Sequence, residues 1–236
     1  MRLNKVSLLA ISSILFFSAC GGGGNGSNNH INSTEPDINS YPKYSLTQDN
    51  KNDLAFMGNE ERLAYDVYMS LYDYHKNRGD EIKQLYNIST KGETKHIQKV
   101  RDLINKYNIT KDDLTILTTS PVSSSTTEQS ALPSGKYDID SIQNLYNTLS
   151  SKGKNSVKDA LEVGCMVEVT DINDLNPKIE HAISSGAEDL EDAFVFLRDG
   201  SYNHYWSFDK GLKNIGIDSG CCSLGEYWCH KEYPQK

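Results

Sequence analysis

Apolar side chains recur at steps of three and four residues in four segments of the chain, which places them along one face of an α-helix in each segment. No segment shows the alternation of apolar and polar residues that is typical of a strand. The pattern predicts an all-α protein. We expect its helices at about 53–76, 80–107, 157–175 and 188–213.

The connections between these segments predict how the helices are arranged. Turn sequences at 77–80 and 184–186 favour two helical hairpins. Residues 108–136 are rich in Ser and Thr and lack an apolar period, so they suit a long crossover, and a short amphipathic helix is expected at 140–149. Two hairpins joined by a long crossover predict a four-helix bundle. Asn176-Pro177 should kink or end the third helix.

Each apolar stripe also carries side chains that can bind metal, near the middle of the helix. These candidate ligands are Glu61, Glu93, His96, Glu168, Asp171 and His204. A lone ionised carboxylate in a core is too costly for a small domain, so several of them on core faces must share a partner. A pair of metal ions is the simplest partner for carboxylates together with histidines.

Spacing supports this interpretation. The midpoint between Glu61 and Glu93 falls in the first predicted turn, and the midpoint between Glu168 and His204 falls in the second. In a hairpin, residues equally far from the turn meet at one height. All four helices should therefore bring their polar residues to one level.

Glu93 and His96 form a Glu-x-x-His motif on adjacent turns, so the carboxylate can bridge two ions while the imidazole caps one. The other half lacks this motif, because Ser201 stands three residues before His204. Either Asp171 replaces the missing carboxylate, or the site is asymmetric, or only one metal binds tightly. Asp171 can instead hydrogen-bond a histidine, and His204 can belong to a polar core layer without metal.

Other polar residues fall around these stripes. Tyr68 lies two turns after Glu61 on the same face, where it can hydrogen-bond a ligand or supply an electron; we favour the hydrogen bond. Glu60 lies off the stripe and should face solvent, and Asp66 should accept from an N–H group or an arginine. No role is assigned to three further histidines, His75, His181 and His230.

Four motifs in order resemble those of a known family. They lie at 60–68, 93–96, 160–172 and 200–204. The chain resembles, over about 53–212, the domain-of-unknown-function family 2202, which is similar to the ferritin-like superfamily. The resemblance implies a ferritin-like bundle but no reaction. It also implies that Ser201 is shared within the family, and that Asn203 matches the family pattern beside the ligands.

The N-terminus predicts an anchored protein. Arg2 and Lys5 precede an apolar run that is too short to span a bilayer, and residues 17–20 resemble a bacterial lipobox that ends at Cys20. Residues 1–20 should therefore be a lipoprotein signal peptide with Cys20 lipidated, and an ordinary cleaved signal peptide is the alternative. Residues 21–50, rich in Gly, Asn and Ser, should be a flexible tether to a bundle at 51–214. The protein should face the periplasm or the cell exterior.

The remaining cysteines are Cys165 and a cluster of three in the C-terminal tail, residues 215–236. In an oxidising compartment they should pair. We expect one pair among Cys221, Cys222 and Cys229, with Cys165 free or bridged to the tail. A metal site of the tail cysteines with His230 has an unusual spacing for zinc and is disfavoured.

The net charge and the candidate ligands limit the classes of function that the protein can have. A net charge of −8 without a basic stripe argues against a nucleic-acid partner. The candidate ligands favour iron as the metal, with manganese as an option, and two ions per site. Such a site is expected to react with oxygen or peroxide, as in a di-iron oxidase or peroxidase. The alternatives are a non-catalytic iron-scavenging lipoprotein and an interaction module with a vestigial site. The oligomeric state stays open.

Overall fold

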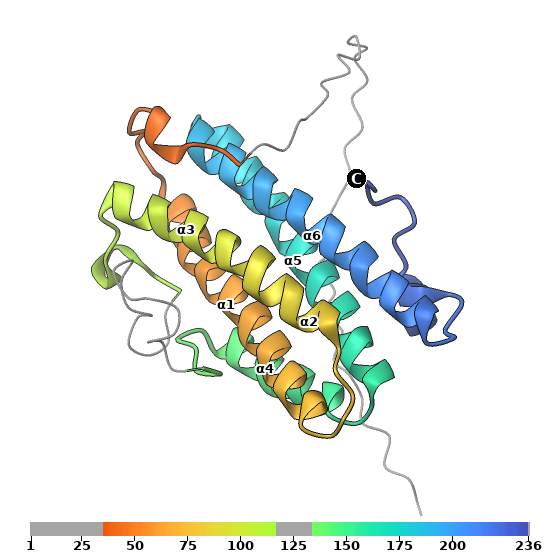
Figure 1. Ribbon diagram of the computed structural model, residues 1–236. Helices are drawn as coiled ribbons and strands as arrows, with labels where there is room; N and C mark the ends of the chain where they lie inside the picture. Colours follow the sequence, from red (N-terminus) through yellow and green to blue (C-terminus); the bar gives the residue numbers. More distant parts are fainter. Residues whose placement is uncertain (1–34, 117–133, 236) are drawn as a thin grey trace, which may run out of the picture. The chain divides into compact units, whose positions relative to one another are not determined.

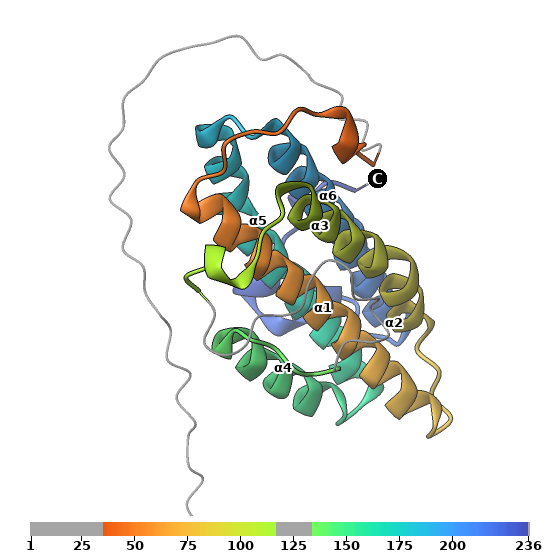
Figure 2. The ribbon, with the colours of Figure 1, turned by 90° about the vertical axis from the view of Figure 1, so that its left-hand side faces the viewer.

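The computed structural model describes residues 35–116 and 134–235, and within these ranges all regular structure is helical (Figures 1 and 2). The prediction of an all-α protein is confirmed. The predicted signal peptide with Cys20, the first part of the predicted tether and part of the predicted crossover lie outside the described residues. The main helices are α1 (Gln48–Lys76), α2 (Lys83–Ile88), α3 (Thr94–Tyr107), α4 (Asp140–Gly153), α5 (Val157–Ser185) and α6 (Glu188–Asn214).

The long helices pack as two hairpins. α1 contacts α2 and α3, and α5 lies along α6, as Figure 1 shows. The hairpins meet where α1 contacts α5 and where α3 contacts α6, while α4 covers one end of α1 and α5 (Figure 2). No helix among the described residues is long and apolar enough to cross a membrane.

The apolar core has two parts with a polar layer between them. One cluster includes Leu71 and Phe208, and the other includes Leu54, Leu103 and Phe194. The apolar stripe residues predicted from the sequence are buried, apart from the half-buried Val157 at the start of α5. The candidate metal ligands lie between the two clusters, at the one level that their spacing predicts.

The ends of the helices follow capping chemistry. The Thr47 side chain accepts from the backbone N–H of Asn50, whose side chain accepts in return from Thr47, so α1 begins earlier than the apolar pattern suggests. Ser156 caps α5 through the N–H of Asp159. Gly186 ends α5 with a φ of 68°, a left-handed conformation that glycine adopts without strain.

The third helix does not end at Asn176-Pro177 as one of the two expectations had it, because α5 continues through Pro177 to Ser185. Pro177 lies on the exposed face of the helix, as does Asn173 four residues earlier. A proline removes the N–H that would bond this carbonyl, and on an exposed face water can replace it. The stripe on the opposite face, with Leu175 and Ile179, stays buried and holds the helix together.

The second predicted helix is also interrupted. Residues Ser89–Glu93 form a π-helical turn, η2, between α2 and α3. The backbone N–H of Thr94 donates to the carbonyl of Ser89, five residues earlier. A π turn carries one residue more than an α turn and is frequent at functional sites. Glu93 is its last residue.

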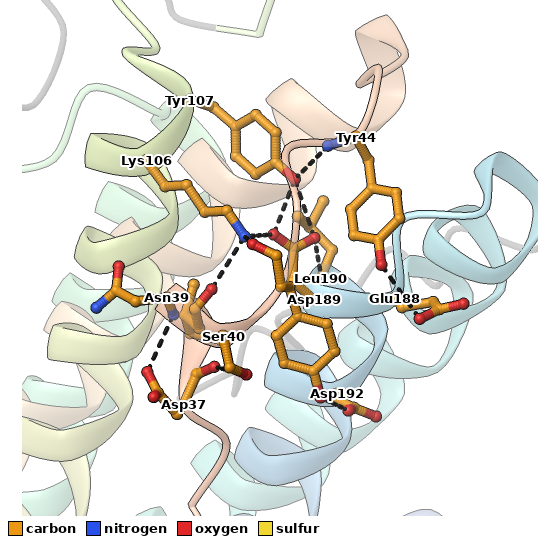
Figure 3. Close-up of polar contacts among 12 residues, drawn as sticks. Asp37, Asn39, Ser40, Tyr44, Lys106, Tyr107, Glu188, Asp189, Leu190 and Asp192 are labelled. Atoms are coloured by element: carbon orange, nitrogen blue, oxygen red, sulfur yellow. Dashed lines mark hydrogen bonds and ion pairs between the residues drawn. The ribbon is translucent and has the colours of Figure 1, made fainter.

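Residues 35–47, which we call the N-terminal strap and which lie within the tether predicted for 21–50, contact α3 and α6. Lys106 of α3 donates to the carbonyls of Ile38 and Tyr41 and to the carboxylate of Asp189 at the start of α6. Figure 3 shows Lys106 and Tyr107 directed at Asp189 from one side. Asp189 is fully buried, so this ion pair ties the strap to both hairpins.

Two disulfide bonds fix the C-terminal tail. Cys222 pairs with Cys229 inside the tail, and Cys165 of α5 pairs with Cys221. The expected tail pair is confirmed, and of the two options for Cys165 the bridge to the tail is the one formed. The buried bridge holds the start of the tail against α5 and α6.

Candidate metal centre

The centre of the polar layer is the carboxylate of Glu93. Its Oε1 lies 3.1 Å from Nδ1 of His204, and its Oε2 lies 3.3 Å from Nδ1 of His96. Ligand atoms of these three residues lie within 4.8 Å of one another. Each oxygen of one carboxylate thus faces a different histidine, from a different hairpin.

Two further glutamates flank this group. Oε2 of Glu61 lies 3.1 Å from Nδ1 of His96, and Oε2 of Glu168 lies 3.4 Å from Nδ1 of His204. Each imidazole nitrogen therefore lies between two carboxylates, one of its own and the shared Glu93. We call these the first half-site (Glu61, His96) and the second half-site (Glu168, His204).

Several polar atoms in the layer are buried without a hydrogen-bond partner. They include Oε1 of Glu61, Oε1 of Glu93, Oδ1 of Asp171 and Nδ1 of His204. The Glu93 and His204 atoms lie 3.1 Å apart as an ion pair, without the geometry of a hydrogen bond. Ligand atoms at about 2.1 Å from an octahedral ion lie about 3 Å from one another. Buried atoms at this separation that lack a hydrogen bond fit a metal site.

Two glycines set the orientation of the imidazoles. A Cβ atom on Gly200 of α6 would lie 2.2 Å from Nε2 of His96, and one on Gly92 of η2 would lie 2.3 Å from Nε2 of His204. Each histidine thus presses its outer edge against a glycine of the opposite hairpin and turns Nδ1 toward the carboxylates. The close contact explains why Gly200 stands inside a helix despite its low propensity.

Asp171 and Ser201 belong to the edge of the layer. The Ser201 hydroxyl lies 2.6 Å from Oδ2 of Asp171 and donates to it, while Oδ1 stays without a partner. Ser201 occupies the position on α6 that Glu93 occupies before His96. The carboxylate missing from α6 is therefore present nearby on α5.

The Tyr68 hydroxyl donates a hydrogen bond to Oε1 of Glu168, as predicted. The ring is fully buried and lies 5.2 Å from the ring of Phe208. This bond fixes the Glu168 carboxylate so that its other oxygen faces His204. An electron-donating role for Tyr68 stays a prediction.

The charges of the layer oppose one another. Burial acts to lower the pKa of both imidazoles, but the carboxylates beside them outweigh it, raising the pKa of His204 to about 10 and that of His96 well above its ordinary value. Burial raises the pKa of Glu61 to about 7. Burial also acts to raise the pKa of Glu93, but the two histidines hold it well below the usual range. Without metal, both imidazoles therefore carry protons at neutral pH.

Two expectations about neighbouring residues are wrong. Glu60 is buried, 3% exposed, because α5 covers the face of α1 on which it lies. Asn203 is exposed, and its amide donates to the carbonyl of Asp199 on its own helix, so it does not support a ligand. Asp66 accepts from the N–H of Gly135 and from a tyrosine hydroxyl, as expected of an off-stripe carboxylate.

The remaining histidines lie outside the layer. Nε2 of His75 lies 2.8 Å from the carbonyl of Gly153. His181 and His230 pair with carboxylates near the surface, those of Asp53 and Glu232. None of the three is placed with the candidate ligands.

The glycine contacts are the part of the site that pattern analysis missed. The sequence does carry a signal for them, since Gly-x-x-x-His occurs at 92–96 and again at 200–204. The repeat relates the two hairpins more closely than Glu-x-x-His does, because Glu93 is replaced by Ser201 while both glycines remain.

Comparison with known proteins gives the chain a family. The model of an uncharacterized protein domain, DUF2202, matches residues 50–227. Uncharacterized protein MJ0754 of Methanocaldococcus jannaschii is 32% identical over 179 residues, which cover 76% of this chain and 83% of the relative. The crystal structure of hypothetical protein MJ0754 from Methanococcus jannaschii superposes with a TM-score of 0.61 at 32% identity, over 75% of this chain and 86% of that one. The chain therefore belongs to the DUF2202 family.

Proposed function

We propose that the protein is a ferritin-like four-helix bundle that binds a pair of iron ions in its polar layer, with manganese as an alternative metal. The observation that carries the proposal is the placement of Glu93, whose two oxygens face two histidines from opposite hairpins. A carboxylate in this position suits a bridge between two ions.

The ligand assignment follows from the two half-sites. Glu61 and His96 would hold one ion, Glu168 and His204 the other, and Glu93 both. Asp171 would complete the set as a ligand or, through Ser201, as a fixed charge at the edge. With Asp171, four carboxylates face the layer, and two divalent ions balance their charge. Charge neutrality in a buried site therefore favours two ions over one.

The donor chemistry favours iron or manganese. Carboxylates and imidazoles are ligands that both metals accept, and the tail cysteines and Cys165 are held in disulfides, so the described residues offer no thiolate here. A bound iron pair would supply redox chemistry toward dioxygen or peroxide. The protein would then be a di-iron oxidase or peroxidase.

The chain's own residues would support such chemistry in three ways. The apolar clusters above and below the layer exclude water. The glycines hold the imidazoles with Nδ1 inward. Tyr68 keeps one oxygen of Glu168 bonded, which leaves the other for a metal.

A non-catalytic, iron-scavenging role is the second candidate. α6 has Ser201 three residues before His204, where the other hairpin has Glu93 before His96, and a site with unequal hairpins suits the storage or transfer of an ion as well as a reaction. A third reading keeps the helices as an interaction module with a vestigial site; the unpaired buried atoms count against it, since a site without metal gains from apolar replacements.

We also propose that the protein is a lipoprotein anchored through Cys20, facing the periplasm or the cell exterior. The two disulfides support an oxidising compartment. Replacement of Cys20 by Ala should abolish lipid labelling. Mature protein that stays labelled in this variant would place the anchor elsewhere.

Metal analysis tests the main proposal. The full-length chain, purified in a mild detergent, is incubated with Fe(II) without oxygen, freed of excess iron, and assayed for iron per chain. We expect two ions for the wild type and a loss of most iron for Glu93→Gln. The matched control is Glu162→Gln, since Glu162 is a buried glutamate of α5 that pairs with lysines outside the layer.

Exposure of the loaded protein to oxygen or peroxide then separates the candidates. Oxidation of both irons with repeated turnover supports an enzyme, while binding without turnover supports scavenging. A wild-type chain without iron, or an unchanged iron content in Glu93→Gln, would defeat the proposal.

A further inference from the structure

A cavity of about 240 Å³ lies between the C-terminal half of α6 and the tail, and none of its lining residues is a candidate metal ligand. Figure 1 shows the tail at this end of α6. The lining residues are Tyr205, Trp206, Asp209, Lys213, Asp218, Ser219, Cys222 and Lys231. The cavity is therefore lined by one cysteine of a disulfide together with charged and aromatic residues.

The two disulfides differ in their accessibility. Cys165 and Cys221 are both 0% exposed, so no reagent reaches this bond in the folded protein. Cys222 is only half-buried, lines the cavity, and pairs with Cys229 only seven residues away. A bond that closes so short a loop constrains the unfolded chain less than the bridge to Cys165, which spans 56 residues.

The cavity is held together without the Cys222–Cys229 bond. Asp209 accepts from the backbone N–H of Cys221 and pairs with Lys213, and the buried bridge fixes Cys221 to α5. Beyond Cys229, the N–H of His230 donates to the Tyr205 hydroxyl. Opening this half-buried disulfide would leave both of its arms in place, so the bond can re-form.

The residues that line the cavity with Cys222 include both positively and negatively charged side chains. Lys231 can bind a carboxylate, and Asp218 can bind an ammonium group. Trp206 and Tyr205 add flat apolar surface. A small molecule that carries an amine, a carboxylate and a thiol matches this set, since its charged groups would find partners while its sulfur faces Cys222.

From the cavity and the half-buried cysteine that lines it, we propose that the Cys222–Cys229 disulfide is a site of thiol–disulfide exchange with low-molecular-weight aminothiols of the cysteine type. The thiolate of the ligand attacks Sγ of Cys222, a new S–S bond forms, and Cys229 leaves as a thiolate with the electron pair of the broken bond. A second aminothiol then attacks the ligand sulfur of the mixed disulfide. It releases the oxidised, symmetrical disulfide and leaves Cys222 as a thiolate, so two aminothiols are oxidised and one protein disulfide is reduced.

The test follows the exchange with four thiols at one thiolate concentration. The full-length chain is treated with cysteine, cysteamine, 3-mercaptopropionate or 2-mercaptoethanol, quenched with acid, and mapped by mass spectrometry. We expect the mixed disulfide on Cys222, formed about tenfold faster with cysteine than with uncharged 2-mercaptoethanol. The Cys165–Cys221 bond should stay oxidised and serves as an internal standard.

Variants of the charged residues connect the rate to the cavity. Lys231→Gln and Asp218→Asn should each remove most of the preference for cysteine, while Lys210→Gln, an exposed lysine of α6 outside the cavity, should keep it. Equal rates for all four thiols, attachment at Cys229 in place of Cys222, or equal reduction of both disulfides would overturn the proposal.

Discussion

The two half-sites have the same plan and differ at one position. On η2 and α3, Gly92 and Glu93 precede His96; on α6, Gly200 and Ser201 precede His204. The glycines and histidines contact each other across the two hairpins: Gly92 packs against the imidazole of His204, and Gly200 packs against that of His96. The shared geometry is thus set by packing, while the carboxylate that joins the halves comes from one hairpin alone. The π turn occurs in the hairpin that supplies it.

The difference teaches that the layer has one central bridge and two unequal sides. Glu93 faces both histidines. At the equivalent position α6 has no second carboxylate, since Ser201 stands there and hydrogen-bonds to Asp171. A change at Glu93 should therefore affect both half-sites, and a change at Ser201 mainly one.

Removal of metal should have the largest effect on stability. Metal at 100 times its dissociation constant should stabilise the folded protein by about 3 kcal/mol, because binding offsets the repulsion among buried carboxylates. Urea unfolding with and without metal measures this. Glu93→Gln should lose the stabilisation for both halves; equal midpoints for the wild type in the two conditions would contradict the two-metal layer.

The pH dependence of the metal-free protein should be the next largest effect. The pKa of His204 is raised by the neighbouring carboxylates to about 10, against burial, so its stabilising contribution is full below about 6.5 and is lost as the pH rises toward 10. Burial raises the pKa of Glu61 to about 7, which also makes the native state lose stability as the pH rises from about 4.5 to 7.

Both pKa shifts make the native state less stable as the pH rises. The urea concentration at the unfolding midpoint of the metal-free protein should therefore decrease when the pH is raised from 6 to 9. The metal-loaded protein should show the opposite trend at limiting metal, since ions bind after the imidazole protons leave. A metal-free midpoint that rises over this interval would show that the layer is not protonated as described.

Replacement of either glycine by alanine should disrupt the half-site whose histidine comes from the opposite hairpin. The new methyl of Gly200→Ala would displace His96, and that of Gly92→Ala would displace His204, at about 1–3 kcal/mol each. Iron per chain should fall from two to one in each variant. Gly58→Ala on α1 is a milder control, because its Cβ would meet Val100 at an ordinary 3.4 Å.

Combination with a histidine change identifies the ion that is lost. His96→Ala added to Gly200→Ala should cost no further iron, whereas His204→Ala added to it should remove the rest. The reverse result would mean that each glycine acts on its own hairpin.

Ser201→Ala should weaken the first half-site, because Gly200, next to Ser201, contacts His96, and Asp171 lies in the field of Glu61 and His96. Asp171 loses its hydrogen bond, and loss of such a supporting contact lowers metal affinity by about 10–100-fold. Titration with Fe(II) should show one site unchanged and one weakened. Ser207→Ala, a half-buried serine of the same helix, is the control; uniform weakening of both sites would remove the distinction between the halves.

Tyr68→Phe should have the smallest effect, about 1 kcal/mol of stability from the lost hydrogen bond to Glu168. Both irons should remain bound. If oxidation of the loaded protein slows greatly in this variant while binding is unchanged, Tyr68 supplies electrons and the role that we favour for it is wrong.

The sequence predicts most of the layer because its signal is periodic. Buried stripes follow from three- and four-residue steps, and turn positions set the height at which Glu61 and Glu93 meet. The burial of Glu60 was not predicted, because α5 covers α1 in addition to the partner of α1 in its own hairpin, so more than one face of α1 is buried. The π turn and the strap depend on packing between distant segments, for which local periodicity carries no information.

The bridge from Cys165 to Cys221 gives the two half-sites different topologies in the unfolded chain. It closes a covalent loop of 56 residues that contains Glu168, Asp171 and His204, whereas Glu61, Glu93 and His96 lie outside it. When the helices separate, the ligands inside the loop stay at a high effective concentration and the others diffuse apart. We therefore expect denaturation to release the ion of the first half-site early, and refolding to recruit metal first within the loop.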